Sequence, residues 1–413
     1  MASAAEQLAK NLNFGTFAKA KALQQRIWFT LGALLVYRLG TYIPVPGIDP
    51  DAYAATFKQA QQGIFGMFDM FAGGAVQRMA IFALNLIPYI TASIVVQVIT
   101  TASPRLEALR KEGESGRRKI NQYTRYLAVL FCAVQAYGIA IGLEGSQGVV
   151  IDPGWFFRLS TVITLVGGTM FLMWLGEQIT SRGIGNGISL IIFAGIVANL
   201  PATVVQTLEL SRTGALPIGW LFGLMLIAIV VIAVIVFFER AQRRLLIQYP
   251  KRQVGNKMFQ GDTSHLPLKL NTSGVIPVIF GSSLLLLPAT IASFAAQGDA
   301  PQWLSVTAAL LGRGQPLYLV LFAVLIIFFA FFYTSIDYVL TRITVIGALY
   351  LTVVALIPEM IHSQLNVSQF IGGTSLLIIV TVTLDTVTQV QSHLIAQQYE
   401  GLVKRSRLGG KRK

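Results

Sequence analysis

Two ionisable side chains lie within long apolar stretches of this chain, and their position suggests a chemistry. Arg38 and Asp385 each sit in a run that is apolar enough to be buried in lipid, where a charge is costly and usually has a function. Such residues can bind a polar solute or a coupling ion, so an ion-coupled secondary transporter is one hypothesis. Nothing in the sequence pairs the two residues. Arg38 could instead reach the membrane surface or donate to backbone carbonyl groups, and Asp385 could face a water-filled vestibule.

Histidine, cysteine and glycine patterns argue against an enzyme or a metal protein. An intramembrane protease needs a Ser–His pair or two aspartates at membrane depth, but the histidines lie in loops or at the end of an apolar run: His265, His362 and His393. The single Cys132 excludes a disulfide within the chain. Gly183, Gly185 and Gly187 imitate a phosphate loop, yet they follow an apolar helix rather than a strand and indicate a tight turn. We therefore expect no catalytic residue, no metal and no cofactor.

Long apolar runs separated by short polar loops dominate the chain and must position these few groups. Of 413 residues, 54% are hydrophobic and 12% are charged, with a mean hydropathy of +0.64. A soluble domain could not bury this much apolar surface, and a membrane-spanning helix needs roughly 20 apolar residues. The pattern predicts ten spans, at 24–43, 76–100, 121–143, 156–178, 186–206, 217–238, 273–294, 316–335, 338–358 and 370–392.

Basic residues gather in alternate loops and give the chain a formal net charge of +14. Large groups follow the second span (Arg105, Arg110, Lys111, Arg117, Arg118, Lys119) and the sixth (Arg240, Arg243, Arg244, Lys251, Arg252, Lys257, Lys269). The tail carries Lys404, Arg405, Arg407, Lys411, Arg412 and Lys413. Because positive loops stay on the cytoplasmic side, both termini are predicted to be cytoplasmic. Anionic lipids, an acidic partner or ribosomal RNA could bind the same charges.

The eighth and ninth spans lack the loop that should separate them. No glycine or proline occurs from Leu317 to Ile346, and one helix through 317–357 would be about 60 Å long, twice the thickness of the hydrocarbon layer. Two helices need a turn, and Thr334-Ser335-Ile336-Asp337 is a poor one. We predict that a polar loop is missing between about Ser335 and Ile336, either deleted from the protein or omitted from this sequence.

Several long blocks of sequence carry a resemblance to a known family. They are KEGESGRRKINQYTRY at 111–126, FLMWLGEQITSRGIGNGISLIIFAGI at 171–196, IFALNLIPYITAS at 81–93, SHLPLKLN at 264–271 and GGTSLLI at 372–378. In these blocks and in their order along the chain, residues 26–398 resemble the SecY/Sec61 alpha family of protein-conducting channel subunits. The resemblance implies a channel that passes unfolded secretory polypeptides across a membrane and releases transmembrane segments sideways into lipid.

The resemblance also implies an architecture. It is an all-α membrane protein whose ten transmembrane helices form two pseudo-symmetric, inverted five-helix halves around a central hourglass pore. An odd number of spans in each half makes such an inverted repeat geometrically possible. The expected parts are a cytoplasmic N-terminal segment (1–23), the N-terminal half (24–207), a hinge loop (208–216), the C-terminal half (217–398) with a cytoplasmic loop at 239–271, and a basic cytoplasmic tail (399–413).

A pore ring and a plug follow from the family's pattern. The ring falls on Leu86, Ile90, Ile188, Ile192, Ile279 and Ile378, where branched apolar side chains would offer no partner to a hydrated ion. Ordinary core packing is the alternative explanation of these residues. The plug falls at 63–74, on Ile64, Phe65, Met67, Phe68, Asp69, Met70, Phe71, Gly73 and Gly74. This segment is apolar but too short to span a membrane, so an interfacial helix on the outer face is the alternative.

A lateral gate and a docking loop complete the expected sites. Polar residues near the gate, between the second and third spans on one side and the seventh and eighth on the other, are Thr91, Ser93, Gln97, Asn271, Thr272 and Ser273. Helix capping and bonding within each half is the alternative for these residues. Ribosome or motor docking falls on Arg240, Arg243, Arg244, Lys251, Arg252 and Lys257, where positive-inside charge alone is the alternative.

Partners and location are also implied by the resemblance. We expect SecE and SecG as small membrane subunits, SecA as the ATP-driven motor, the ribosome, signal peptides and nascent chains, and anionic membrane lipids. The expected location is the bacterial plasma (inner) membrane.

Overall fold

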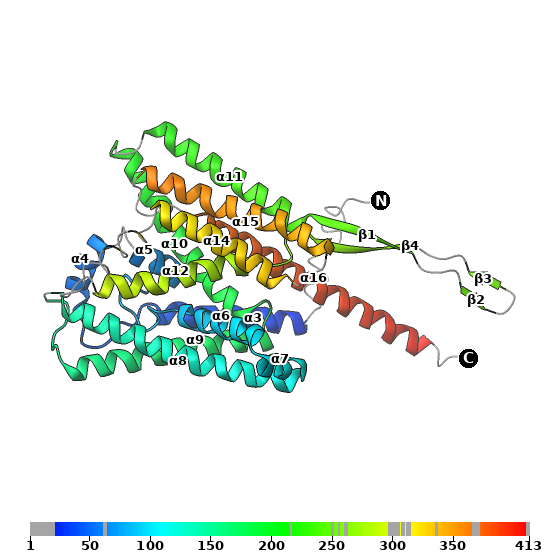
Figure 1. Ribbon diagram of the computed structural model, residues 1–413, viewed down its shortest axis with the longest axis horizontal. Helices are drawn as coiled ribbons and strands as arrows, with labels where there is room; N and C mark the ends of the chain where they lie inside the picture. The colour runs from blue at the N-terminus through cyan, green and yellow to red at the C-terminus, as the bar shows by residue number, and fades with distance from the viewer. Residues whose placement is uncertain are drawn as a thin grey trace. The chain divides into compact units, whose positions relative to one another are not determined.

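A helix lies on each predicted span of the chain (Figure 1). The computed structural model describes residues 21–60, 64–146, 148–214, 217–248, 252–254, 257–259, 263–295, 306, 310, 315–334, 338–365 and 372–409. The helices on the spans are α3 Lys21–Gly40, α6 Ile87–Ala102, α8 Glu114–Glu144, α9 Trp155–Arg182, α10 Gly187–Arg212, α11 Ile218–Arg240, α12 Ile276–Ala295, α14 Pro316–Tyr333, α15 Tyr338–Leu365 and α16 Gly373–Gly409. Shorter helices are α4 Pro50–Ala60, α5 Ile64–Ala72 and α7 Pro104–Lys111.

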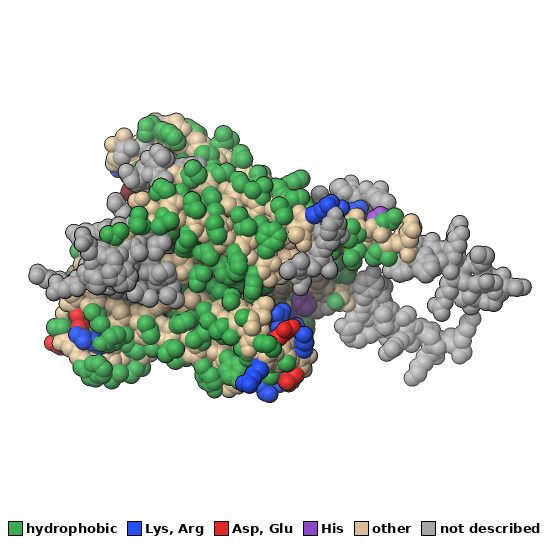
Figure 2. Space-filling view, viewed as in Figure 1, with side chains coloured by type: hydrophobic (Ala, Val, Ile, Leu, Met, Phe, Trp, Pro, Cys, Tyr) green, Lys and Arg blue, Asp and Glu red, His purple; other side chains and the backbone are tan. Residues whose placement is uncertain are grey.

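Most of these helices are long and apolar enough to cross a membrane. In the described part of the chain, seven meet this test by themselves: α8, α9, α10, α11, α14, α15 and α16. Helix α6 meets it together with α7, from which it is bent by 100°. Large apolar side chains such as Phe156 and Trp155 remain 84% and 70% exposed, and Figure 2 shows hydrophobic side chains spread over the visible helical surface. Long apolar helices with exposed apolar faces indicate a multi-pass, helical membrane protein.

The second span begins later than the sequence predicted. Helix α6 starts at Ile87, and residues 73–86 form turns instead of the helix expected from residue 76. Met79 and Asn85 adopt left-handed backbone conformations (φ 43° and 49°), which a helix cannot contain. The backbone of this segment pairs with residues 43–45 instead, through Val45 N–H to Met79 O (2.9 Å) and Ile81 N–H to Ile43 O (2.9 Å).

Two other boundaries also differ from the prediction. Helix α10 continues to Arg212, so most of the expected hinge loop at 208–216 is helical. Helix α16 runs for 37 residues to Gly409, and the tail expected to begin at 399 starts as its continuation. A polar sequence at the end of a helix suggests a loop, but the backbone hydrogen bonds of a helix can continue through polar residues, many of which have good helix propensity.

The chain divides into two compact units. The first comprises Met1–Val205, Leu286–Gly312 and Val382–Lys413, and the second comprises Gln206–Leu285 and Arg313–Thr381. In the first unit α8 packs against both α6 and α9, and α3 packs against α9. The rings of Tyr37, Phe82 and Phe171 stack in series, with centroid distances of 6.2 and 5.9 Å. This stack joins α3, the turns before α6, and α9.

The second unit combines apolar helices with a β-hairpin that the sequence did not predict. Helix α15 packs against α14 and α11, and Phe238 of α11 stacks on Tyr350 of α15 at 4.3 Å. In the expected cytoplasmic loop, β1 Gln242–Gln248 pairs antiparallel with β4 Thr263–Lys269, and β2 Arg252–Val254 pairs with β3 Lys257–Phe259 (Figure 1). Helix α14 ends at Tyr333 and α15 begins at Tyr338, so the single helix of about 60 Å is excluded.

Candidate functional site: the plug segment and its surroundings

The predicted plug is a short apolar helix followed by two glycines in the left-handed conformation. Helix α5 covers Ile64–Ala72, and Gly73 and Gly74 have φ of 67° and 83°. The N–H of Gly74 donates to Asp69 O at 3.2 Å, the six-residue closure of a Schellman motif. Gly63, the first residue of the expected plug, lies outside the described residues, as do the side chains of Ile64, Phe65, Met67 and Phe68. Phe71 is buried against α10, where Gly195 touches its carbonyl group.

Side chains from three other parts of the first unit donate to the backbone carbonyl groups at the end of this helix. The bonds are Asn199 Nδ2 to Asp69 O (3.1 Å), Asn85 Nδ2 to Phe71 O (2.6 Å), Tyr37 Oη to Ala72 O (3.2 Å), Arg38 Nη1 to Gly73 O (2.6 Å) and Arg78 Nη1 to Gly74 O (3.3 Å). Sequence reasoning named Arg38 only as a charge at membrane depth and missed the other donors. The alternative that Arg38 donates to carbonyl groups is confirmed.

Asp69 is the one acidic residue of the expected plug, and it is buried with 5% of its surface exposed. Its Oδ1 accepts the backbone N–H of Gln77 at 2.9 Å. Burial raises the pKa of the Asp69 carboxyl, while the hydrogen bond from Gln77 and the nearby guanidinium groups of Arg78 and Arg38 act in the opposite direction. The carboxyl therefore ties the plug to the chain that follows it.

The predicted ring residues are divided between the two units. In the first unit Leu86, Ile90 and Ile192 are buried and Ile188 is half-buried. In the second unit Ile378 is buried and Ile279 is half-buried. Leu86 is the N-cap of α6 and not an internal residue of a helix, so the expected pair on one helix face applies only in part. Its carbonyl accepts the N–H of Ile90 at 2.9 Å.

The predicted gate residues have hydrogen bonds within their own units. Thr91 Oγ1 donates to Ile87 O (3.0 Å), and Gln97 Nε2 donates to Ser93 Oγ (3.3 Å). Asn271 Nδ2 donates to Glu239 Oε1 (2.7 Å), Ser273 Oγ to Asn271 Oδ1 (3.2 Å), and Thr272 Oγ1 lies 3.4 Å from Thr334 Oγ1. These bonds agree with the alternative of bonding within each half, and the gate stays a prediction.

The docking residues belong to the hairpin and its approach. Arg240 is the last residue of α11, and Arg243 and Arg244 are exposed on β1, opposite Leu268 and Pro267 of β4. Arg252 and Lys257 lie in β2 and β3, and Lys251 lies outside the described residues. Because side chains alternate across a strand, Arg243 and Arg244 point to opposite faces of the hairpin.

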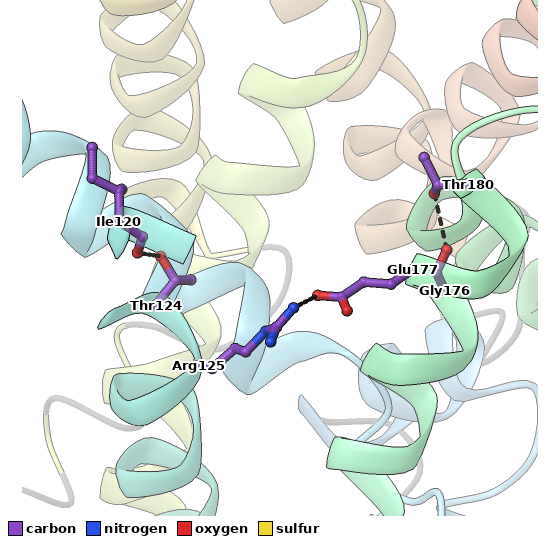
Figure 3. A network of polar contacts seen from close by, with 6 residues as sticks. All are labelled: Ile120, Thr124, Arg125, Gly176, Glu177 and Thr180. Atoms are coloured by element: carbon purple, nitrogen blue, oxygen red, sulfur yellow. Dashed lines mark hydrogen bonds and ion pairs between the residues drawn. The ribbon is translucent and has the colours of Figure 1, made fainter. Parts of the chain in front are cut away.

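An ion pair that the sequence did not reveal joins α8 to α9. Arg125 Nη2 lies 2.6 Å from Glu177 Oε1, and Figure 3 shows the two side chains reaching toward each other. Next to it, Thr180 Oγ1 donates to Gly176 O (2.9 Å) and accepts the N–H of Gly187 (2.8 Å). The two hydrogen bonds of Thr180 hold the turn before α10 in place. The sequence predicted this turn from Gly183, Gly185 and Gly187. Among the described residues, no group of three His, Cys, Asp or Glu could hold a metal ion.

Known proteins resemble this chain over most of its length. The SecY family model matches residues 80–338 and 335–387. A protein translocase subunit SecY from Rickettsia conorii is 50% identical, over 94% of this chain and 97% of its own. Among solved structures, a SecY protein whose plug domain is described as stabilising the closed state of the translocation channel has a TM-score of 0.62 at 17% identity, covering 90% of this chain and 92% of its own. Sec61 in a canine ribosome–channel complex has a TM-score of 0.59 at 15% identity, with the same coverage.

The matches also bear on the missing loop. The two matched stretches of the family model meet at 335–338, at the short connection between α14 and α15. The alignment with the Rickettsia relative runs over 421 positions, more than the 413 residues of this chain, so the relative has residues with no counterpart here. The break in the family match falls where the missing loop is predicted, whereas the alignment length does not place the extra residues of the relative, so the missing loop stays a prediction.

Proposed function

This chain belongs to the SecY family, and we propose how its parts act in a protein-conducting channel. It is a translocation channel subunit and not an enzyme, with several helices that cross the membrane. The observation that carries this conclusion is the family match through residues 80–387 together with 50% identity to a protein translocase subunit over 94% of the chain. An ion-coupled transporter has no comparable support, because Arg38 is engaged with Gly73 O and the hydroxyl of Tyr42.

The seal is formed by the six branched apolar residues of the predicted ring. Their side chains offer hydrated ions no hydrogen-bond partner, so an unoccupied constriction stays dry. An unfolded polypeptide can pass because the ring makes no specific bonds with it. Helix α5 closes the same route at rest and moves aside when a chain enters. The channel then releases apolar segments sideways, through a gate beside Thr91, Ser93 and Gln97 on one side and Asn271, Thr272 and Ser273 on the other.

Movement requires partners, which dock on the basic hairpin. Arg240, Arg243, Arg244, Arg252 and Lys257 present positive charge to the ribosome, whose RNA is anionic, or to an acidic surface of the SecA motor. SecE and SecG complete the membrane complex, which lies in the bacterial inner membrane with both termini of this chain in the cytoplasm. Anionic lipids contact the positive loops.

Translocation in proteoliposomes tests this function. The full chain is reconstituted with SecE and SecG and supplied with SecA, ATP and an unfolded preprotein that carries a signal peptide. The channel function predicts that the preprotein becomes protected from added protease, and that a signal-less version does not. Uptake of labelled small solutes without any preprotein protection would contradict it and favour a transporter.

A further inference from the structure

We propose that Tyr37, Arg38, Arg78, Asn85 and Asn199 form a latch that holds the plug in the closed channel and must be released for the plug to move. The inference deepens the proposed function, since it rests on α5 being the plug. The latch is defined by the hydrogen bonds of these five side chains to the carbonyl groups of residues 69–74.

The latch acts at the place where a helix most needs donors. The last four carbonyl groups of a helix have no partner within it, and α5 has nine residues, so nearly half of its carbonyl groups are of this kind. Here backbone N–H groups reach two of these carbonyl groups, from Gly74 to Asp69 O (3.2 Å) and from Ala75 to Ala72 O (3.3 Å). Side chains from outside the plug add donors to Asp69 O, Phe71 O and Ala72 O, and the two arginines donate to Gly73 O and Gly74 O just after the helix. Moving the plug away would leave buried donors without acceptors, which costs more than the bond itself contributes.

Three separate parts of the first unit supply the donors. Tyr37 and Arg38 come from α3, Arg78 and Asn85 from the turns before α6, and Asn199 from α10. Tyr37 and Asn85 are each 1% exposed, and the ring of Tyr37 is held by its stack on Phe82. Because these elements are packed in place, the donors remain where they are when the plug leaves. The bonds therefore favour one position of α5 over others.

Two of the donors, Arg38 and Arg78, are cations, and a positive charge is favourable at the C-terminal end of a helix. The guanidinium carbon of Arg78 lies 4.2 Å from the centre of the Tyr42 ring and that of Arg38 lies 5.0 Å from it. Tyr42 also accepts a hydrogen bond from Arg38 Nη2 at 2.9 Å. The C-terminal end of a helix carries partial negative charge, so both arginines attract the end of α5 as well as bonding to it.

The glycines after the plug are consequently fixed in the closed state. Gly73 and Gly74 have no side chains to restrict their backbone, but the carbonyl groups of both are bonded to arginines. On the other side, Gly195 of α10 approaches Phe71 O so closely that a Cβ would collide with it. A free hinge would let α5 open without cost. The latch instead sets a threshold that an incoming polypeptide must overcome.

Isosteric removal of single donors tests the latch. Tyr37→Phe removes one hydroxyl and keeps the ring that stacks on Phe82, and Asn199→Asp replaces the donating amide by an oxygen. Each change should raise the resting ion conductance of the full complex in planar bilayers about fivefold, the factor expected for one hydrogen bond. The double variant should give roughly the product of the two effects, because the donors come from different elements.

Tyr53→Phe is the matched control. Tyr53 is also a buried tyrosine, and its hydroxyl donates to Val76 O at 2.7 Å, beyond the residues that the latch holds. Loss of the Tyr53 hydroxyl should weaken packing about as much as loss of the Tyr37 hydroxyl, but it should leave the resting conductance unchanged. Equal conductance in Tyr37→Phe, Asn199→Asp and Tyr53→Phe would overturn the latch, whether all three stay sealed or all three leak.

A second readout follows the plug itself. Met70, which is half-buried in α5, is replaced in the variant Met70→Cys, made in a Cys132→Ala background. The complex is then treated with a membrane-impermeant maleimide. The latch predicts faster labelling with Tyr37→Phe than with Tyr53→Phe, and faster labelling still when an arrested preprotein occupies the channel. Identical labelling in both variants would contradict it. Translocation by the parent complex is measured in parallel: its absence would refute the proposed function, whereas a failed latch would leave it intact.

Discussion

Single side chains of the proposed ring decide between a seal and ordinary core packing. Ile90 and Ile192 are buried in the first unit, and Ile279 is half-buried in the second. Burial alone agrees with a ring and equally with ordinary packing. The two explanations differ in what a polar side chain would do, because a ring excludes ions only while it stays apolar.

Polar replacement of ring residues should open a path for ions. Ile90→Asn, Ile192→Asn and Ile279→Asn should each raise the resting conductance in planar bilayers, by about tenfold when two are combined, since the constriction can then hold water. Ile191→Asn is a control in the first unit, because Ile191 neighbours Ile192 in α10 and is fully buried. If the Ile191 variant leaks as much as the Ile192 variant, general disruption and not a ring explains the result.

Asp69 gives the resting seal a pH dependence. Burial raises the pKa of its carboxyl above the ordinary 3.8, so the closed plug holds a proton at a pH where a displaced, hydrated plug has lost it. Protonation of Asp69 therefore stabilises the closed position of the plug. This contribution is complete below pH 3.8 and is lost as the pH rises through the raised pKa. Resting conductance should therefore fall as the pH is lowered through the raised pKa of Asp69.

Asp69→Asn tests this dependence directly. Asparagine keeps an oxygen that accepts the N–H of Gln77 but carries no charge, so the variant should seal at least as well as the parent at neutral pH and lose the pH dependence. Asp69→Ala has no such oxygen and should leak about fivefold more. Conductance measured from neutral pH down to about pH 4 distinguishes these cases, and an unchanged pH profile in Asp69→Asn would count against the role of this carboxyl.

At the scale of elements, the basic loop is a hairpin whose two faces differ. Arg243, Leu245 and Ile247 share one face with Leu266 and Leu268, and the other face carries Arg244 with His265 and Lys269. The sequence indicated the charge of this loop but not its strands, because β1 and β4 are separated by fourteen residues and, among the described strands, each pairs with the other alone. Such long-range pairing leaves little signal within either segment.

Charge reversal on the hairpin should weaken docking. Arg244→Glu should reduce binding of ribosomes or SecA to proteoliposomes about tenfold at low salt, and the difference should shrink as added salt screens it. Arg243→Glu reports on the opposite, more apolar face. Arg212→Glu makes the same charge change at the last residue of α10, which is predicted to lie on the opposite side of the membrane from the hairpin. Losses that are equal for Arg212 and Arg244, or independent of salt, would argue against docking on the hairpin.

The positions of the helices could be predicted from the sequence, but contacts between distant segments could not. Span positions were recovered because apolar length is a local property, as in α9 and α11. The start of α6 was missed, because residues 76–86 are apolar yet adopt turns that pair with residues 43–45. Ring, plug and gate residues came from family resemblance. The latch was not predicted, because Tyr37, Asn85 and Asn199 are distant in sequence and meet only in the folded first unit.

The proposed function requires residues of both units to line one route for polypeptides. Leu86, Ile90, Ile188 and Ile192 belong to the first unit, and Ile279 and Ile378 belong to the second. A chain that passes through this protein must therefore touch residues of both units. A chain that passed along its outer surface would touch exposed apolar side chains such as Phe156, which is 84% exposed.

Photo-crosslinking of an arrested preprotein measures this directly. A photoreactive amino acid is placed singly at each of the six ring positions and, for comparison, at Phe156, and the complex is irradiated while the preprotein is held midway. The account predicts crosslinks from ring positions of both units and none from Phe156. Crosslinks from Phe156 with none from any of the six ring positions would contradict it.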